Sequence, residues 1–167
     1  MMEEWLIVDG YNVIGAHTGW STLPLEESRL RLMALLSEYQ AISGRRVVLV
    51  FDAHRSPGGE SRQLEQQLTV YFTRERETAD QLIERLVKRL KQPDRLIYVA
   101  TSDYLEQRMV FGQGAYRISS RELLEEMERM KGKIAKQIQT APKGRGPLGQ
   151  GLGEEVLRKL EQWRRKK

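Results

Sequence analysis

The sequence predicts an α/β fold in which helices cover both faces of a mainly parallel sheet. Short apolar runs typical of buried strands alternate with amphipathic segments typical of helices. This alternation favours parallel strands joined by crossover helices. The chain has 167 residues, enough for one domain with a substantial core and too few for two ordinary ones.

The expected strands are short, apolar and often β-branched. They cover residues 4–9, 45–53, 68–73, 95–103 and 115–119. Two of the expected helices, over 23–43 and 78–92, carry apolar residues at helical spacing and are followed by Gly44 and Pro93, which are typical stop signals. The other two cover about 103–112 and 120–139, and a polar loop that includes residues 57–59 is expected before the strand at 68–73.

Positive charge is concentrated in the C-terminal part of the chain. Residues 1–128 carry 16 Lys and Arg against 20 Asp and Glu, whereas residues 129–167 carry 12 against 3. We therefore predict a main domain over 1–139 and a basic segment over 140–167, with a Gly-rich linker and a final helix. A basic segment of this kind favours a polyanionic partner such as RNA or a ribosome, although a solvated helical tail would have the same composition.

Composition excludes several classes of protein. There are no cysteines, so disulfides and thiolate metal sites are absent. No apolar run reaches the length of a membrane span, so no membrane partner is expected. The acidic residues near the start do not resemble the basic region of a secretory signal. The simplest expectation is a cytoplasmic protein.

Acidic residues occur where three of the expected strands end. Asp9, Asp52 and Asp103 follow apolar runs, and Asp80 begins the helix expected after the third strand. In parallel sheets, ligands bind outside the carboxyl ends of the strands. Four carboxylates gathered there would repel one another unless a cation neutralises them. Oxygen ligands suit Mg²⁺ or Mn²⁺, which would support metal-assisted cleavage of a phosphodiester.

Two short polar side chains accompany these acids, and each acid also has a structural explanation. Asn12 and Ser102 could hold a metal-bound water or a substrate oxygen. However, Thr78 and Gln81 form a capping box around Asp80. Asp103 could cap the next helix, and Asp9 and Asp52 could belong to ordinary turns. Their shared position at one edge of the predicted sheet favours a site.

Five short motifs in this order resemble the YacP-type NYN domains, which are relatives of the PIN-like nucleases. They are DGYN (9–12), VFDAH (50–54), ETAD (77–80), ATSD (100–103) and GQGAYRISSREL (112–123). The resemblance covers nearly the whole chain, including the basic end LEQWRRKK. It implies a three-layer α/β/α sandwich with a metal-dependent endoribonuclease site.

The resemblance also implies roles for individual residues. Asp9, Asp80 and Asp103 would be the metal ligands, with Asn12 as their polar catalytic partner and Asp52 in a supporting position. The supporting position of Ser102 is expected from its place beside Asp103 alone. Members of the YacP type act on messenger RNA in the context of the translating ribosome, so RNA and the ribosome are the expected partners. No obligate protein partner is evident.

Basic residues near the predicted crevice are the expected contacts for RNA or the ribosome. Lys143 and Arg145 lie in the Gly-rich linker, and Arg55 and Arg76 lie in loops. Further arginines expected to flank the crevice are Arg45, Arg46, Arg62 and Arg74. Surface ion pairs with neighbouring glutamates would give the same pattern.

Two other functions fit the same sequence. A non-catalytic module could use this fold to bind RNA or a ribosome, and it would then need no metal. A toxin-type PIN nuclease is the second alternative, although such proteins usually need an antitoxin. A phosphoryl-receiver domain fits less well, because the chain has Ser119, Ser120 and Arg121 where a lysine would follow the last strand.

Overall fold

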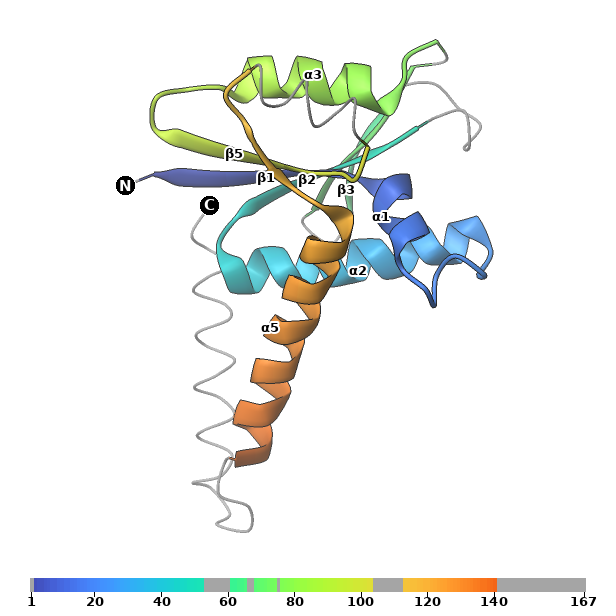
Figure 1. The fold of residues 1–167 in the computed structure, drawn as a ribbon, viewed down its shortest axis with the longest axis vertical. Coiled ribbons are helices and arrows are strands. Elements are labelled where there is room, and N and C mark those ends of the chain that lie inside the picture. The colour runs from blue at the N-terminus through green and yellow to red at the C-terminus, as the bar shows by residue number, and fades with distance from the viewer. Residues whose placement is uncertain (1, 53–60, 66–67, 75, 104–112, 141–167) are drawn as a thin grey trace.

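The centre of the molecule is a mainly parallel sheet (Figure 1). The computed structural model describes residues 2–52, 61–65, 68–74, 76–103 and 113–140. Within them the six strands have the order β3-β4-β2-β1-β5-β6. Their bounds are β1 Glu3–Asp9, β2 Arg46–Phe51, β3 Ser61–Glu65, β4 Leu68–Phe72, β5 Arg95–Ala100 and β6 Tyr116–Ile118. Only the edge strand β3 is antiparallel to its neighbour, so the predicted sheet type is confirmed.

Helices cover both faces of this sheet, which gives the predicted three layers. In the described part of the chain they are α1 Gly10–Ala16, α2 Leu25–Ser43, α3 Ala79–Leu90 and α5 Ser120–Thr140. In Figure 1, α3 lies on one face of the sheet, and α2 and α5 lie on the other. Within the residues described, none of the helices has the length and hydropathy needed to cross a bilayer.

Each face of the sheet has its own apolar core, because side chains alternate along a strand. Leu6 and Val8 of β1 belong to the cluster that includes side chains of α1, α2 and α5. Ile7, between them, belongs to the cluster that includes side chains of α3. The face of a β1 residue therefore follows from its position along the strand.

The expected end of α2 is confirmed at Gly44. Its φ is 76°, in the left-handed region, and its N–H donates to the Gln40 carbonyl at 3.2 Å. Glycine adopts this conformation without the steric penalty of a side chain. The turn directs the chain into β2, whose first residues lie at the amino end of the sheet.

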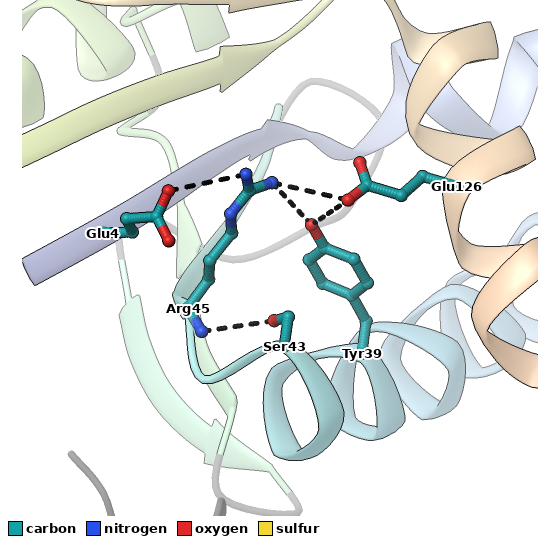
Figure 2. A network of polar contacts seen from close by, with 5 residues as sticks. All are labelled: Glu4, Tyr39, Ser43, Arg45 and Glu126. Atoms are coloured by element: carbon teal, nitrogen blue, oxygen red, sulfur yellow. Dashed lines mark hydrogen bonds and ion pairs between the residues drawn. The ribbon is translucent and has the colours of Figure 1, made fainter. Parts of the chain in front are cut away.

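A polar network at this amino end joins α2, α5 and the first strand (Figure 2). The Tyr39 hydroxyl donates to Glu126 Oε1 at 3.2 Å and accepts from Arg45 Nη1 at 2.7 Å. Arg45 also pairs with Glu4 at 3.5 Å. Burial raises the pKa of Tyr39 to about 12, although the Arg45 guanidinium acts in the opposite direction. The network fixes α5 to the sheet.

Two elements were not expected from the sequence. The short helix α1 follows β1 without a loop, in a segment where no helix was predicted. The strand β3 falls in a segment predicted as loop, and its sequence SRQLE is polar, as is common for an edge strand. The helix expected over about 103–112, the linker and the final helix at 154–167 lie outside the described residues.

Candidate active site at the carboxyl ends of the strands

The predicted acids of the first, second and fifth strands gather at one edge of the sheet. Asp9 is the last residue of β1 and is in register with Val50 of β2, two residues before Asp52. On the other side, Val8 is in register with Ala100, three residues before Asp103. Because these strands are parallel and adjacent, the acids follow neighbouring strand ends.

Asp9 and Asp80 belong to the same face of the sheet. Alternation places Asp9 on the face of Ile7, which packs with α3. Asp80 lies in the first turn of α3, after the chain has left the carboxyl end of β4. The N-terminal end of α3 carries a partial positive charge, which favours carboxylates or a phosphate nearby. Asp9 and Asp80 therefore lie at the carboxyl end of the sheet, on the face that α3 covers.

Asp9 differs from an ordinary helix-capping aspartate. It occupies the N-cap position of α1, yet its side chain makes no capping hydrogen bond. It is also only 8% exposed, whereas aspartate is mostly exposed in folded proteins. The ordinary turn considered for Asp9 is thus a helix start, and the Asp9 carboxylate does not cap it.

The capping box predicted at α3 is confirmed, and the Asp80 side chain takes no part in it. The Thr78 hydroxyl accepts from the Gln81 backbone N–H at 3.4 Å, and the Gln81 side chain accepts from the Thr78 N–H at 2.9 Å. Both capping bonds are thus made without the Asp80 carboxylate. Asp80 remains partly exposed beside this helix end.

Gly10 allows the sharp passage from β1 into α1 beside the second strand. A Cβ at this position would lie 2.6 Å from Phe51 Cδ1 and 3.0 Å from the Val50 carbonyl oxygen. Distances this short exclude a side chain unless the neighbours move. Close backbone contact with β2 thus fixes the position of Asp9, the preceding residue.

Asn12 links three segments at this edge. Its Oδ1 accepts from the Ser102 backbone N–H at 2.8 Å and from Ser120 Oγ at 2.6 Å. Ser102 Oγ in turn accepts from the Ser120 backbone N–H at 3.2 Å. Because two donors face the Asn12 oxygen, its amide NH₂ group points away from them. Asn12 thus joins α1 to the segment after β5 and to the start of α5.

The segment that carries Asp103 is held by hydrogen bonds from its backbone N–H groups. The Thr101 N–H donates to the Ile118 carbonyl at 3.0 Å, and the Asp103 N–H donates to Thr101 Oγ1 at 3.0 Å. The Ser102 N–H between them donates to Asn12. Asp103 itself is exposed. An exposed carboxylate is therefore held on a constrained backbone.

The donors at this edge fit a hard divalent cation in their chemistry. Asp9, Asp80 and Asp103, with Asp52 beside them, offer only oxygen ligands, as Mg²⁺ and Mn²⁺ prefer. Among the residues described here, no three His, Cys, Asp or Glu side chains lie close enough together to hold a metal ion. Mg²⁺ often uses one or two carboxylates, with water and substrate phosphate completing its shell. The arrangement fits that mode rather than a complete protein ligand set.

Two pairs of the predicted basic residues lie at opposite ends of the sheet. Arg74 and Arg76 lie between β4 and α3, at the same edge as the acids, and Arg76 is exposed. The prediction for Arg45 and Arg46 is wrong, because they lie at the amino end of β2. There Arg45 pairs with Glu4 and Glu126, and Arg46 with Glu3.

The remaining basic residues do not add to the site as described. Arg62 lies in the edge strand β3. Arg55, Lys143 and Arg145 lie outside the described residues.

Two contacts at this edge had no signal in the sequence. Ser120 is fully buried and bonds to Asn12, 108 positions earlier in the chain. Arg29 Nη1 of α2 donates to the Tyr11 hydroxyl at 3.1 Å, and the Tyr11 ring lies 4.9 Å from that of Phe51. The position of Ser120 at a helix start is visible in the sequence, but its distant partner is not.

A small pocket of about 140 Å³ lies elsewhere in the molecule. Its lining includes Lys91, at the end of α3, and Arg95, at the start of β5. These positions mark the amino end of the sheet, opposite the acids. The pocket is therefore separate from the candidate active site.

Comparison with known proteins agrees with the fold. The family model for the YacP-like NYN domain matches residues 6–165. The chain is 46% identical over 165 residues to the "Uncharacterized protein YacP" of Bacillus subtilis (strain 168), covering 96% of each chain.

Two crystal structures of Rae1 (YacP) from Bacillus subtilis are similar to the whole chain. One, of a tryptophan-to-leucine mutant, has a TM-score of 0.80 at 41% identity, covering 97% of this chain and 95% of that one. The other has a TM-score of 0.75 at 44% identity, covering 96% and 94%. These matches imply a nuclease-type, PIN-like fold, and the chain belongs to the YacP-like NYN domain family.

Proposed function

We propose that the protein is a divalent-metal-dependent endoribonuclease that cleaves messenger RNA, with the translating ribosome as its setting. The observation that carries this proposal is the position of Asp9. It is a nearly buried carboxylate at the carboxyl end of a central strand, and it shares a face with the start of α3, which carries Asp80. In a nuclease-type fold, a carboxylate in this position can bind a divalent cation for phosphodiester cleavage.

Of the proposed ligands Asp9, Asp80 and Asp103, one or two would bind the cation directly, with water and substrate phosphate completing its shell. The remaining acids, including Asp52, would add negative charge nearby. Bound there, Mg²⁺ or Mn²⁺ would neutralise charge on the scissile phosphate and favour ionisation of the attacking water. The Asn12 NH₂ group can donate to a phosphate oxygen, because its carbonyl oxygen is already engaged by Ser102 and Ser120. Asn12 therefore both orients the site and offers a donor to substrate.

RNA and ribosome binding would come from the basic residues. Arg76 lies at the edge with the acids, and Arg55, Lys143 and Arg145 are the further proposed contacts. The concentration of positive charge in residues 129–167 supports a polyanionic partner. Such contacts supply affinity without base specificity.

The test is cleavage of a messenger RNA with Mg²⁺ or Mn²⁺, with and without translating ribosomes. We expect metal-dependent cuts by the wild type that are lost in Asp9→Asn and Asp80→Asn. The matched control is Asp94→Asn, which removes the same charge from an exposed residue before β5, at the opposite edge. Equal cutting by the Asp9 and Asp94 variants would contradict the assignment of the site.

The binding-module alternative has one observation in its favour, the lack of a three-residue metal group among the described side chains. It predicts that RNA or ribosome binding survives Asp9→Asn and that no metal is needed. Ribosome binding without cleavage under any metal condition would support this alternative. Cleavage that does not need ribosomes would support the nuclease activity and contradict the proposed dependence on translation.

A further inference from the structure

Ser120 is a buried residue with two hydrogen bonds to residues at the acidic edge. It is 0% exposed and begins the 21-residue helix α5. Its hydroxyl donates to Asn12 Oδ1 at 2.6 Å, and its backbone N–H donates to Ser102 Oγ at 3.2 Å. Asn12 Oδ1 also accepts from the Ser102 N–H. Asn12, Ser102 and Ser120 thus form a closed ring of hydrogen bonds.

This ring connects the two chain segments that carry Asp9 and Asp103. Asn12 lies three residues after Asp9, with no loop between β1 and α1. Ser102 immediately precedes Asp103, whose own N–H is held by Thr101. The relative position of Asp9 and Asp103 therefore depends on the Asn12 contacts.

The role of Ser120 follows from burial. Ser102 is exposed, so its N–H could bond to water if Asn12 turned away. The Ser120 hydroxyl has no access to solvent, so turning Asn12 would leave a buried donor unpaired, which is strongly unfavourable. Ser120 thus restrains Asn12 more strongly than Ser102 does.

We infer that Ser120 is a positioning residue for the cation-binding edge, acting through Asn12 to hold Asp103 in place relative to Asp9. This inference depends on the proposed metal-dependent function. Residues that orient metal ligands typically change metal affinity by about 10- to 100-fold when they are mutated. Ser120 touches none of the reacting groups, so its effect should appear first in metal affinity.

The experiment measures Mn²⁺ binding directly, from the electron paramagnetic resonance signal of free Mn²⁺, in the full-length protein. Ser120→Ala is compared with Ser28→Ala, which removes another buried serine hydroxyl. Ser28 is 1% exposed, and its Oγ donates to the Trp20 carbonyl at 2.8 Å, outside the ring. Both variants lose one buried hydrogen bond, so thermal denaturation should show similar losses of stability.

We expect Ser120→Ala to raise the Mn²⁺ dissociation constant by about 10-fold, and Ser28→Ala to leave it unchanged. Cleavage by Ser120→Ala should recover at high Mn²⁺, which a general loss of stability would not produce. Equal Mn²⁺ affinities for the two variants would overturn the inference. If Ser120→Ala does not fold, Ser120→Cys replaces the hydroxyl with a weak S–H donor of similar size. Wild-type Mn²⁺ affinity in that variant would overturn the inference.

The same titration separates this inference from the proposed function. If the wild type does not bind Mn²⁺, or if Asp9→Asn binds it as tightly as the wild type does, the metal-dependent function itself is contradicted. If Asp9→Asn abolishes binding but Ser120→Ala matches Ser28→Ala, only the positioning role fails.

Discussion

Replacing Gly10 with alanine should destabilise the protein, although alanine is normally the better helix former. The new Cβ would lie 2.6 Å from Phe51 Cδ1 and 3.0 Å from the Val50 carbonyl oxygen. Phe51 is 0% exposed, and its ring lies between those of Tyr11 and Phe72, at 4.9 and 5.6 Å. It has little room to move, and the Val50 carbonyl belongs to a central strand.

The expected size of the effect comes from two opposing contributions. Glycine to alanine within a helix gains up to about 1 kcal/mol. Overpacking a filled core costs about 1–3 kcal/mol. Because one of the close atoms belongs to backbone, we expect the upper part of that range and a net loss of about 1–2 kcal/mol.

Gly15 supplies a matched control in the same helix. A Cβ there meets nothing within 4 Å, so Gly15→Ala should stabilise the protein by up to about 1 kcal/mol. Urea denaturation followed by circular dichroism measures both variants. Gly10→Ala should also reduce RNA cleavage, because the clash would displace the adjacent Asp9.

Opposite signs for the two variants are the essential result. If both glycines can be replaced with the same gain in stability, the close approach of α1 to β2 is not the reason for glycine at position 10. If Gly10→Ala is unstable but retains full cleavage per folded molecule, the placement of Asp9 does not depend on this contact.

Two further predictions concern hydrogen bonds. Asn12→Ala should lower the free energy of unfolding by about 1–3 kcal/mol, measured by thermal denaturation, because it leaves the buried Ser120 hydroxyl unpaired. Asn12→Asp keeps both accepted hydrogen bonds and should be more stable than Asn12→Ala. Both variants should lose RNA cleavage, because both lack the NH₂ donor. Equal instability would contradict the role given to Oδ1. Stability should also fall between pH 10 and 12, because the pKa of Tyr39 is raised from 10.0 to about 12 in the folded protein: the unfolded phenol ionises first, so the folded state binds more protons in that interval. The loss is about 2–3 kcal/mol, measured by urea denaturation against pH, and the same slope in Tyr39→Phe would refute it.

Local sequence signals were sufficient where a segment has one strong pattern. The amphipathic helix α3, its capping box at Thr78 and the glycine end of α2 at Gly44 were all predicted and confirmed. The three expected acidic strand ends follow neighbouring parallel strands. Short or polar elements were missed, because α1 has only seven residues and β3 has an edge strand's polar sequence.

The sequence by itself determined the fold class, the sheet type and the edge where the acids gather, because alternation, capping and turn chemistry act over a few residues. The tertiary structure decided that α3 covers the Ile7 face of β1, that Arg45 and Arg46 lie at the opposite end, and that Asn12 is held by Ser102 and Ser120. These facts depend on strand register and on contacts between residues as far as 108 positions apart. Such contacts form only when the whole sheet assembles, so no local pattern records them.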